Sequence, residues 1–212
     1  EYFDFYTVTE NMAIAAGLTM PKLYVIEDEA PNAFATGRDE KHAVVAATTG
    51  LLALLDRQEL EGVIAHELSH IKNRDMLVMT VAVVLAGFLA ILADIFLRMS
   101  FSGGDRDNSR GGLFMILAIV GIVLAPIAAQ LIQLAISRRR EFLADASGAL
   151  LTRYPEGLAR ALQKISGYGA PMQHASHATA HLFIANPYGP KAMNFVNGLF
   201  STHPPVAASV KA

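Results

Sequence analysis

Two long uncharged runs constrain this 212-residue chain more than any other feature of its sequence. Residues 76–93 and residues 113–137 contain no charged side chain, and each run is long enough to cross a bilayer as an α-helix. Hydrophobic residues make up 53% of the chain and charged residues 17%, so the composition is more apolar than that of most soluble proteins. Two buried helices of a soluble protein are the alternative, but a chain of this size has little other structure to cover such runs. We therefore predict two transmembrane helices.

These two helices are expected to form a hairpin. A polar loop at residues 100–112 joins them, so the chain returns to the side of the membrane that it left. Five lysines and arginines flank the outer ends of the hairpin and three lie at or near its loop, which predicts that the outer ends face the cytoplasm. The absence of cysteine agrees with a reducing compartment. The chain then divides into residues 1–75, the hairpin at 76–137, and residues 138–212.

A His-Glu-x-x-His pattern at residues 66–70 precedes the first run. His66 and His70 are four residues apart, so on a helix both imidazoles lie on one face and can reach one metal ion. Glu67 is placed to take a proton from water at that ion. Asp56 followed by Glu59 has the form of a capping box, which predicts that a helix carrying the pattern begins there. The sequence thus predicts a catalytic zinc site, and a coincidental spacing of two histidines is the alternative.

Catalytic zinc usually takes three protein ligands, and Glu141 is the predicted third. The hairpin would bring Glu141 back to the membrane surface beside His70. Asp145, one helical turn further on, can hold a histidine ligand through its far nitrogen, although the two acids could also form a solvated helix face. A rival histidine cluster lacks a carboxylate in the catalytic position, and a polar loop is its simpler interpretation; it comprises His174, His177 and His181.

Short apolar or alternating runs at residues 22–26, 32–36 and 43–48 predict a small sheet before the zinc helix. Helical patterns are also present at 9–16 and 155–166. An exposed edge of this sheet can accept an extended peptide as an added strand, while an ordinary hairpin strand is the alternative. The residues expected to contact such a substrate are Asn32, Ala33, Phe34 and Ala35. A net charge of -2 gives no indication of nucleic-acid binding.

Six segments occur in the order found in the HtpX family of membrane-bound zinc metalloproteases, which this chain resembles from about Leu18 to Pro205. The catalytic core of that family is similar to that of the CAAX prenyl proteases. The segments are Asn-Ala-Phe-Ala-Thr-Gly at 32–37, Thr-Gly-Leu-Leu at 49–52, the histidine motif at 66–70 with Asn73 and Asp75, Arg-Arg-Glu-Phe at 139–142 with Asp145, His-Leu-Phe-Ile-Ala-Asn-Pro at 181–187, and Ser-Thr-His-Pro-Pro at 201–205.

The resemblance implies zinc bound by His66, His70 and Glu141, with Glu67 as the general base. It also implies that Asn32 and His203 bind the substrate backbone or stabilise the transition state. The expected fold is α+β: a mainly helical, gluzincin-like zinc protease domain with a small N-terminal sheet and an inserted transmembrane hairpin.

The implied function is stress-response quality control, in which damaged or misfolded membrane proteins are cleaved at a bacterial or archaeal cytoplasmic membrane. The expected partners are therefore polypeptides and the lipid bilayer. The chain departs from the family in two places. The family has a further hydrophobic hairpin upstream, so we expect that such a segment precedes Glu1, and residues 206–212 are mostly small where the family continues with a charged helix.

Two other classes of function compete with a zinc endopeptidase. A non-catalytic membrane zinc-binding interaction protein would usually close its site with four protein ligands and would need no adjacent base, so Glu67 argues against it. A CAAX-type prenyl-protein protease would share the chemistry, but two predicted spans are too few for a large chamber within the membrane.

Overall fold

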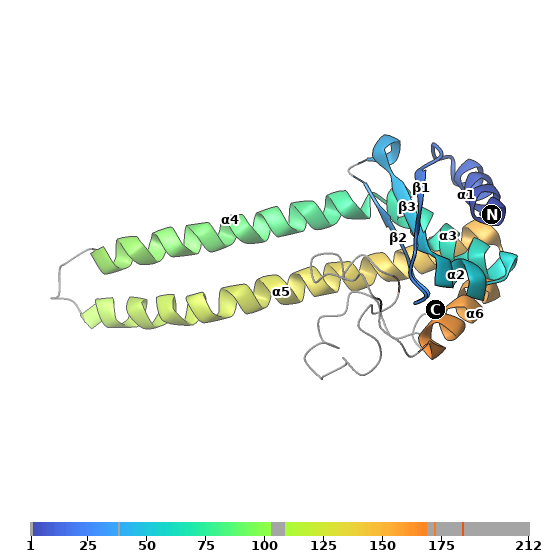
Figure 1. Ribbon diagram of the computed structural model, residues 1–212. Helices are drawn as coiled ribbons and strands as arrows, with labels where there is room; N and C mark the ends of the chain where they lie inside the picture. Colours follow the sequence, from blue (N-terminus) through green and yellow to red (C-terminus); the bar gives the residue numbers. More distant parts are fainter. Residues whose placement is uncertain (1, 38, 103–108, 169–171, 173–183, 185–212) are drawn as a thin grey trace. The chain divides into compact units, whose positions relative to one another are not determined.

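The computed structural model describes residues 2–37, 39–102, 109–168, 172 and 184. The chain forms two compact units, one made of Glu1–Leu77 with Ser137–Ala212 and the other of Val78–Ile136. The described elements are α1 (Phe3–Ala16), β1 (Lys22–Ile26), β2 (Ala33–Thr36), η1 (Glu40–His42), β3 (Val44–Thr48), α2 (Thr49–Leu54), α3 (Arg57–Lys72), α4 (Asp75–Ser102), α5 (Ser109–Thr152) and α6 (Pro155–Gly167) (Figure 1). The structure is therefore mainly helical with a small sheet.

The predicted sheet is confirmed, and its topology is mixed. The strand order is β1-β3-β2, with β1 parallel and β2 antiparallel to β3. Val45 to Thr48 in the central strand β3 are buried, as expected for a strand with neighbours on both sides. Strand β2 lies at an edge of the sheet and packs against α3.

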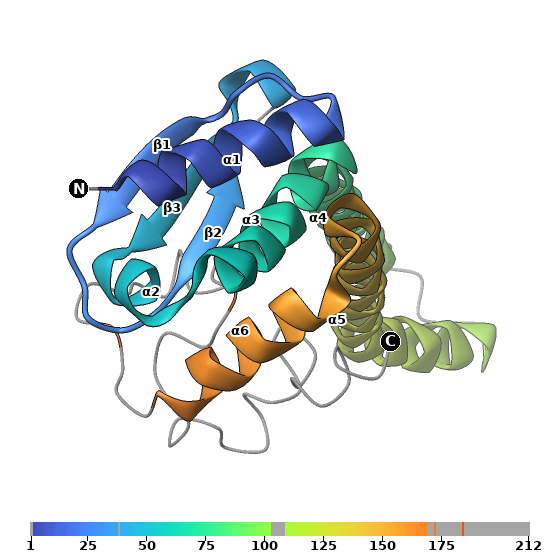
Figure 2. The same cartoon turned by 90° about the vertical axis from the view of Figure 1, so that its right-hand side faces the viewer.

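Helix α3 is the central element of the first unit, and it begins where the capping box predicts. The Asp56 carboxylate accepts the Glu59 backbone N–H, and the Glu59 carboxylate accepts the Asp56 backbone N–H, both at 2.9 Å. Residues 62–69 are all buried. Figure 2 shows α3 running between α1 and α6, against both of which it packs. A Cβ atom at Gly62 would come within 2.5 Å of the Leu158 backbone nitrogen, so glycine is required for the close approach of α6.

Helix α1 begins at Phe3, six residues before the predicted start, and ends at Ala16 as predicted. The aromatic residues of its first turns have modest helix propensity, which is why the local pattern misses them. Burial of Phe5 and Val8 in the core stabilises these turns. Gly17 adopts a left-handed conformation with φ of 71° and closes the helix.

Helix α4 contains an apolar stretch, Asp75–Leu92, that is long and apolar enough to cross a membrane by length and composition. Only 6% of this stretch is buried, and its exposed side chains include Leu85, Phe88 and Leu89. The second predicted span falls within α5, where the side chains of residues 109–126 lie outside the described part of the structure. One candidate span is thus present among the described residues, and the hairpin itself stays a prediction.

Helix α5 continues without a break from Ser109 to Thr152. The sequence pattern predicts the apolar run at 113–137 and the charged segment at 138–145 as separate features. In the structure both belong to one helix. Arg138, Arg139 and Arg140 do not end the helix, because arginine has high helix propensity.

Candidate metal centre

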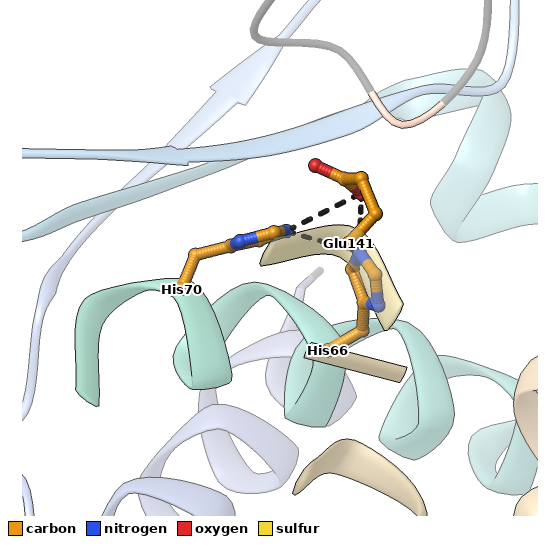
Figure 3. A group of neighbouring side chains, drawn as sticks. All are labelled: His66, His70 and Glu141. Atoms are coloured by element: carbon orange, nitrogen blue, oxygen red, sulfur yellow. Dashed lines mark hydrogen bonds and ion pairs between the residues drawn. The ribbon is translucent and has the colours of Figure 1, made fainter. Parts of the chain in front are cut away.

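His66 and His70 lie one turn apart on α3, and Glu141 approaches them from α5. Their side chains point toward one another (Figure 3). The two Nε2 atoms are 3.1 Å apart, and Glu141 Oε2 lies 3.7 Å from His66 Nε2 and 3.8 Å from His70 Nε2. The structure therefore brings together all three residues that the sequence predicts as metal ligands.

This cluster has the size and chemistry of a zinc site. Zinc holds nitrogen and oxygen ligands at about 2.0–2.1 Å, so the ligand atoms of a tetrahedral site lie about 3.3 Å apart. The measured separations of 3.1, 3.7 and 3.8 Å lie close to that value. Two imidazoles and one carboxylate also leave a fourth position for water or substrate, which is how catalytic zinc sites differ from closed structural ones.

Close packing of α5 on α3 positions Glu141. A Cβ atom at Gly148 would lie 3.1 Å from the His66 backbone nitrogen, so a larger residue would push the two helices apart. Ala144, one turn before Gly148, is fully buried. Asp145, one turn after Glu141, lies with Oδ1 2.9 Å from His66 Nδ1. The carboxylate can thus hold the far nitrogen of His66, so that Nε2 is turned toward the metal position.

Asp75 supports His70 in the same way, a contact that the sequence alone does not predict. Its Oδ2 lies 2.7 Å from His70 Nδ1. Arg140 donates from its guanidinium to Asp75 Oδ1 and to the Asn73 carbonyl, so it fixes the carboxylate from the other side. Within the sequence, only the position of Asp75 five residues after His70 hints at this contact. Arg140 lies 65 residues after Asp75, so no local pattern connects these two residues.

His70 has a pKa raised to about 9. Burial of the imidazole lowers the pKa, but the hydrogen bond to Asp75 and the nearby carboxylates of Glu141 and Glu67 outweigh it. The imidazole therefore carries a proton at neutral pH when no metal is bound. A metal ion that binds at Nε2 displaces this proton, because a metal-bound imidazole must be neutral.

Glu67 occupies the buried part of α3 beside His66, with 2% of its surface exposed. Its carboxylate lies close enough to the metal cluster to raise the pKa of His70. It is not one of the three residues whose ligand atoms converge. A buried carboxylate next to a metal position, and outside the ligand set, is suited to proton transfer.

Asn32 and Ala33, at the start of the predicted substrate-binding segment, form hydrogen bonds within the protein itself. Asn32 is 2% exposed, and its backbone N–H and C=O both bond to Thr48. Its side chain accepts the Ala33 N–H and donates toward the Met172 sulfur. The Ala33 carbonyl accepts the N–H of Ile184, so the chain itself covers part of the β2 edge. His203 and the rival cluster His174, His177 and His181 lie outside the described residues.

An HExxH helix with a buried base and a converging third ligand defines the catalytic core of a metallopeptidase. The sequence profile described as "Peptidase family M48" matches residues 4–212, and the chain belongs to this family. It is 49% identical to a "Protease HtpX homolog" of Caldanaerobacter subterraneus subsp. tengcongensis, over 100% of this chain and 71% of the relative. It is 48% identical to a protein of the same name from Tropheryma whipplei, over 97% and 70%. The resemblance to the HtpX family is thus confirmed.

A solved structure shows the same fold. The "Crystal Structure of S. mikatae Ste24p" matches with a TM-score of 0.63 at 22% sequence identity. The match covers 97% of this chain and 49% of that one, so the chain spans about half of the solved protein. At this level of identity the likeness concerns the fold alone.

Proposed function

We propose that this metallopeptidase is a zinc-dependent endopeptidase of the bacterial or archaeal cytoplasmic membrane that cleaves damaged or misfolded membrane proteins. The observation that supports it best is the convergence of His66, His70 and Glu141 at distances suited to zinc, directly before an apolar helix that begins at Asp75. An active site so close to a candidate membrane span suits substrates that emerge from the bilayer.

The residues of the site have distinct roles in this proposal. Zinc held by His66, His70 and Glu141 would supply Lewis acidity to the scissile carbonyl and to water. Glu67 accepts the proton of the attacking water and then delivers it to the departing amine. Asp145 and Asp75 hold the far nitrogens of His66 and His70, which keeps both imidazoles oriented. His203 is proposed to donate a hydrogen bond to the developing oxyanion.

The membrane arrangement is part of the proposal. All but one of the side chains in the apolar stretch of α4 are exposed or only partly buried, and a soluble monomer rarely exposes a continuous apolar surface of that extent. We propose that α4 and the apolar part of α5 cross the membrane as a hairpin at residues 76–137. Residues 1–75 and 138–212 then lie on the cytoplasmic side and together form the protease domain.

Removal of the metal should abolish proteolysis. With the purified protein in detergent and an unfolded membrane protein as substrate, we expect cleavage with zinc present, loss of cleavage with a chelator, and recovery when zinc is added back. Gel electrophoresis and mass spectrometry of the fragments measure this. A prenylated CAAX peptide serves as a second substrate. Preferential cleavage of that peptide would favour the prenyl-protease alternative, and chelator-resistant cleavage would contradict the zinc mechanism.

Cysteine labelling tests the proposed topology, because the chain has no cysteine of its own. Ser102→Cys, in the predicted loop at 100–112, should react in intact cells with an impermeant maleimide. Ser166→Cys lies at an exposed position of α6 and should react only after the cells are permeabilised. Equal labelling of both variants in intact cells would rule out the hairpin with a cytoplasmic protease domain.

A further inference from the structure

A cavity of about 440 Å³ lies directly beside the metal centre. His70 forms part of its wall, so an occupant of the cavity lies next to a proposed zinc ligand. The other walls come from the end of β2, from η1, from the last turn of α3 and from the first residues of α4. This volume lies within the range of ligand sites and is large enough for a bulky side chain with the backbone that carries it.

The wall of the cavity is mainly apolar. Among the described residues, two acidic side chains, Asp39 and Glu40, and two basic side chains, Lys41 and Arg74, line it together with His70. Glu40 and Arg74 form an ion pair at 4.0 Å. The hydrocarbon surface comes from Ala35, Ala43, Ile71, Met76 and Leu77. Such hydrocarbon surface favours an apolar occupant, because contact between the two removes apolar surface from water.

Strand β2 can lead a peptide to this cavity. The carbonyl of Ala33 points away from β3, since it accepts the N–H of Ile184. Backbone groups alternate in direction along an antiparallel strand, so the N–H and C=O of Ala35 face the same side of β2, away from β3. Ala35 and Gly37 also line the cavity. A peptide that pairs with β2 at Ala35 therefore runs past the cavity and can place a side chain in it.

We propose that this cavity is the specificity pocket of the protease and that it receives a large apolar side chain, such as Phe or Leu, from a residue next to the scissile bond. The inference rests on the proposed function, since it takes the metal centre as the place of cleavage. It adds the substrate class: segments rich in bulky apolar residues. Met76 and Leu77 also belong to the apolar stretch that begins at Asp75, so the pocket adjoins the candidate membrane span.

Filling the pocket tests this assignment. Peptides that differ at one position beside the cleaved bond are compared, with Phe, Leu, Ala, Asp or Lys at that position. The parent protein should cleave the Phe and Leu peptides with a kcat/KM at least about tenfold above that of the Ala peptide. Leu77→Trp should reduce this advantage to less than about threefold, because the indole takes the space. Leu85→Trp, an exposed position further along α4 and outside the pocket, is the matched control and should keep the full preference.

A second filled variant and a binding measurement complete the test. Ala43→Phe fills the pocket from the sheet side and should act like Leu77→Trp. The zinc-loaded Glu67→Gln protein should bind the Phe peptide at least about tenfold more tightly than the Ala peptide, which tests the pocket even if no hydrolysis occurs. A failure of hydrolysis alone would count against the proposed function. Equal binding of the two peptides would overturn the pocket assignment. So would an unchanged preference for Phe in both filled variants, which is the result expected if the cavity holds lipid and not a substrate side chain.

Discussion

Replacing Glu67 by glutamine should lower kcat by about 10²- to 10⁴-fold while the protein keeps one zinc ion per chain. Glutamine has nearly the same shape as glutamate, so the buried site on α3 can accommodate it, but it cannot accept the proton of the attacking water. The three ligand atoms of His66, His70 and Glu141 are unchanged. Peptide hydrolysis and metal analysis of the same preparation measure the two quantities, and we expect them to separate.

Glu61→Gln is the matched control for this substitution. Glu61 lies on the same helix and forms an ion pair with Arg57 at 3.5 Å, away from the metal cluster. Its replacement should leave both kcat and zinc content near the parent values, because partly exposed ion pairs contribute little. Loss of zinc in the Glu67→Gln protein, or turnover close to that of the parent, would show that Glu67 is not the base.

Replacing Glu141 by alanine should raise the dissociation constant for zinc by more than about 100-fold and abolish hydrolysis. The substitution removes one of the three converging ligands, whereas loss of a residue that only orients a ligand costs about 10- to 100-fold. Asp75→Asn provides that smaller effect for comparison, since Asp75 contacts His70 Nδ1 and does not belong to the converging cluster. We therefore expect a graded series, with the parent binding most tightly and Glu141→Ala most weakly.

Competition with a chromogenic chelator measures these constants, and circular dichroism verifies that each variant stays folded. If the Glu141→Ala protein bound zinc as tightly as the parent, the third ligand would be another residue. The histidines at 174, 177 and 181 would then be the next residues to replace. If Asp75→Asn weakened zinc as much as Glu141→Ala, Asp75 would have to be counted among the ligands.

Much of the fold could be predicted from sequence because its signals are local. The capping box at Asp56 and Glu59 fixes the start of α3, and Gly17 fixes the end of α1. The three strand segments are bounded by turn-forming residues, so their limits agree with the structure to within a residue. The mixed strand order could not be predicted in this way, because it depends on which strands meet in space. The early start of α1 also depends on burial of Phe5 in the core.

For the metal centre as well, one part could be predicted from local spacing and another depends on tertiary packing. The spacing of His66 and His70 on one helix predicts their convergence, since helical periodicity fixes it. The convergence of Glu141 with the two histidines needs a contact between α3 and α5, and the sequence suggested it through the expected return of the chain from the membrane and through the resemblance to the HtpX family. The structure brings the three residues together because Gly148 allows close packing of the two helices.

The sequence by itself determined the local parts of this protein: the histidine motif with Glu67, the small strands and the apolar run that follows them. Periodicity and capping between near neighbours specify these features. Only the tertiary structure decided which histidine Asp145 lies beside, that Asp75 contacts His70 and Arg140, and that a cavity with an apolar wall adjoins the metal centre. These features depend on residues far apart in the chain, and their positions are set by packing, which no local pattern encodes.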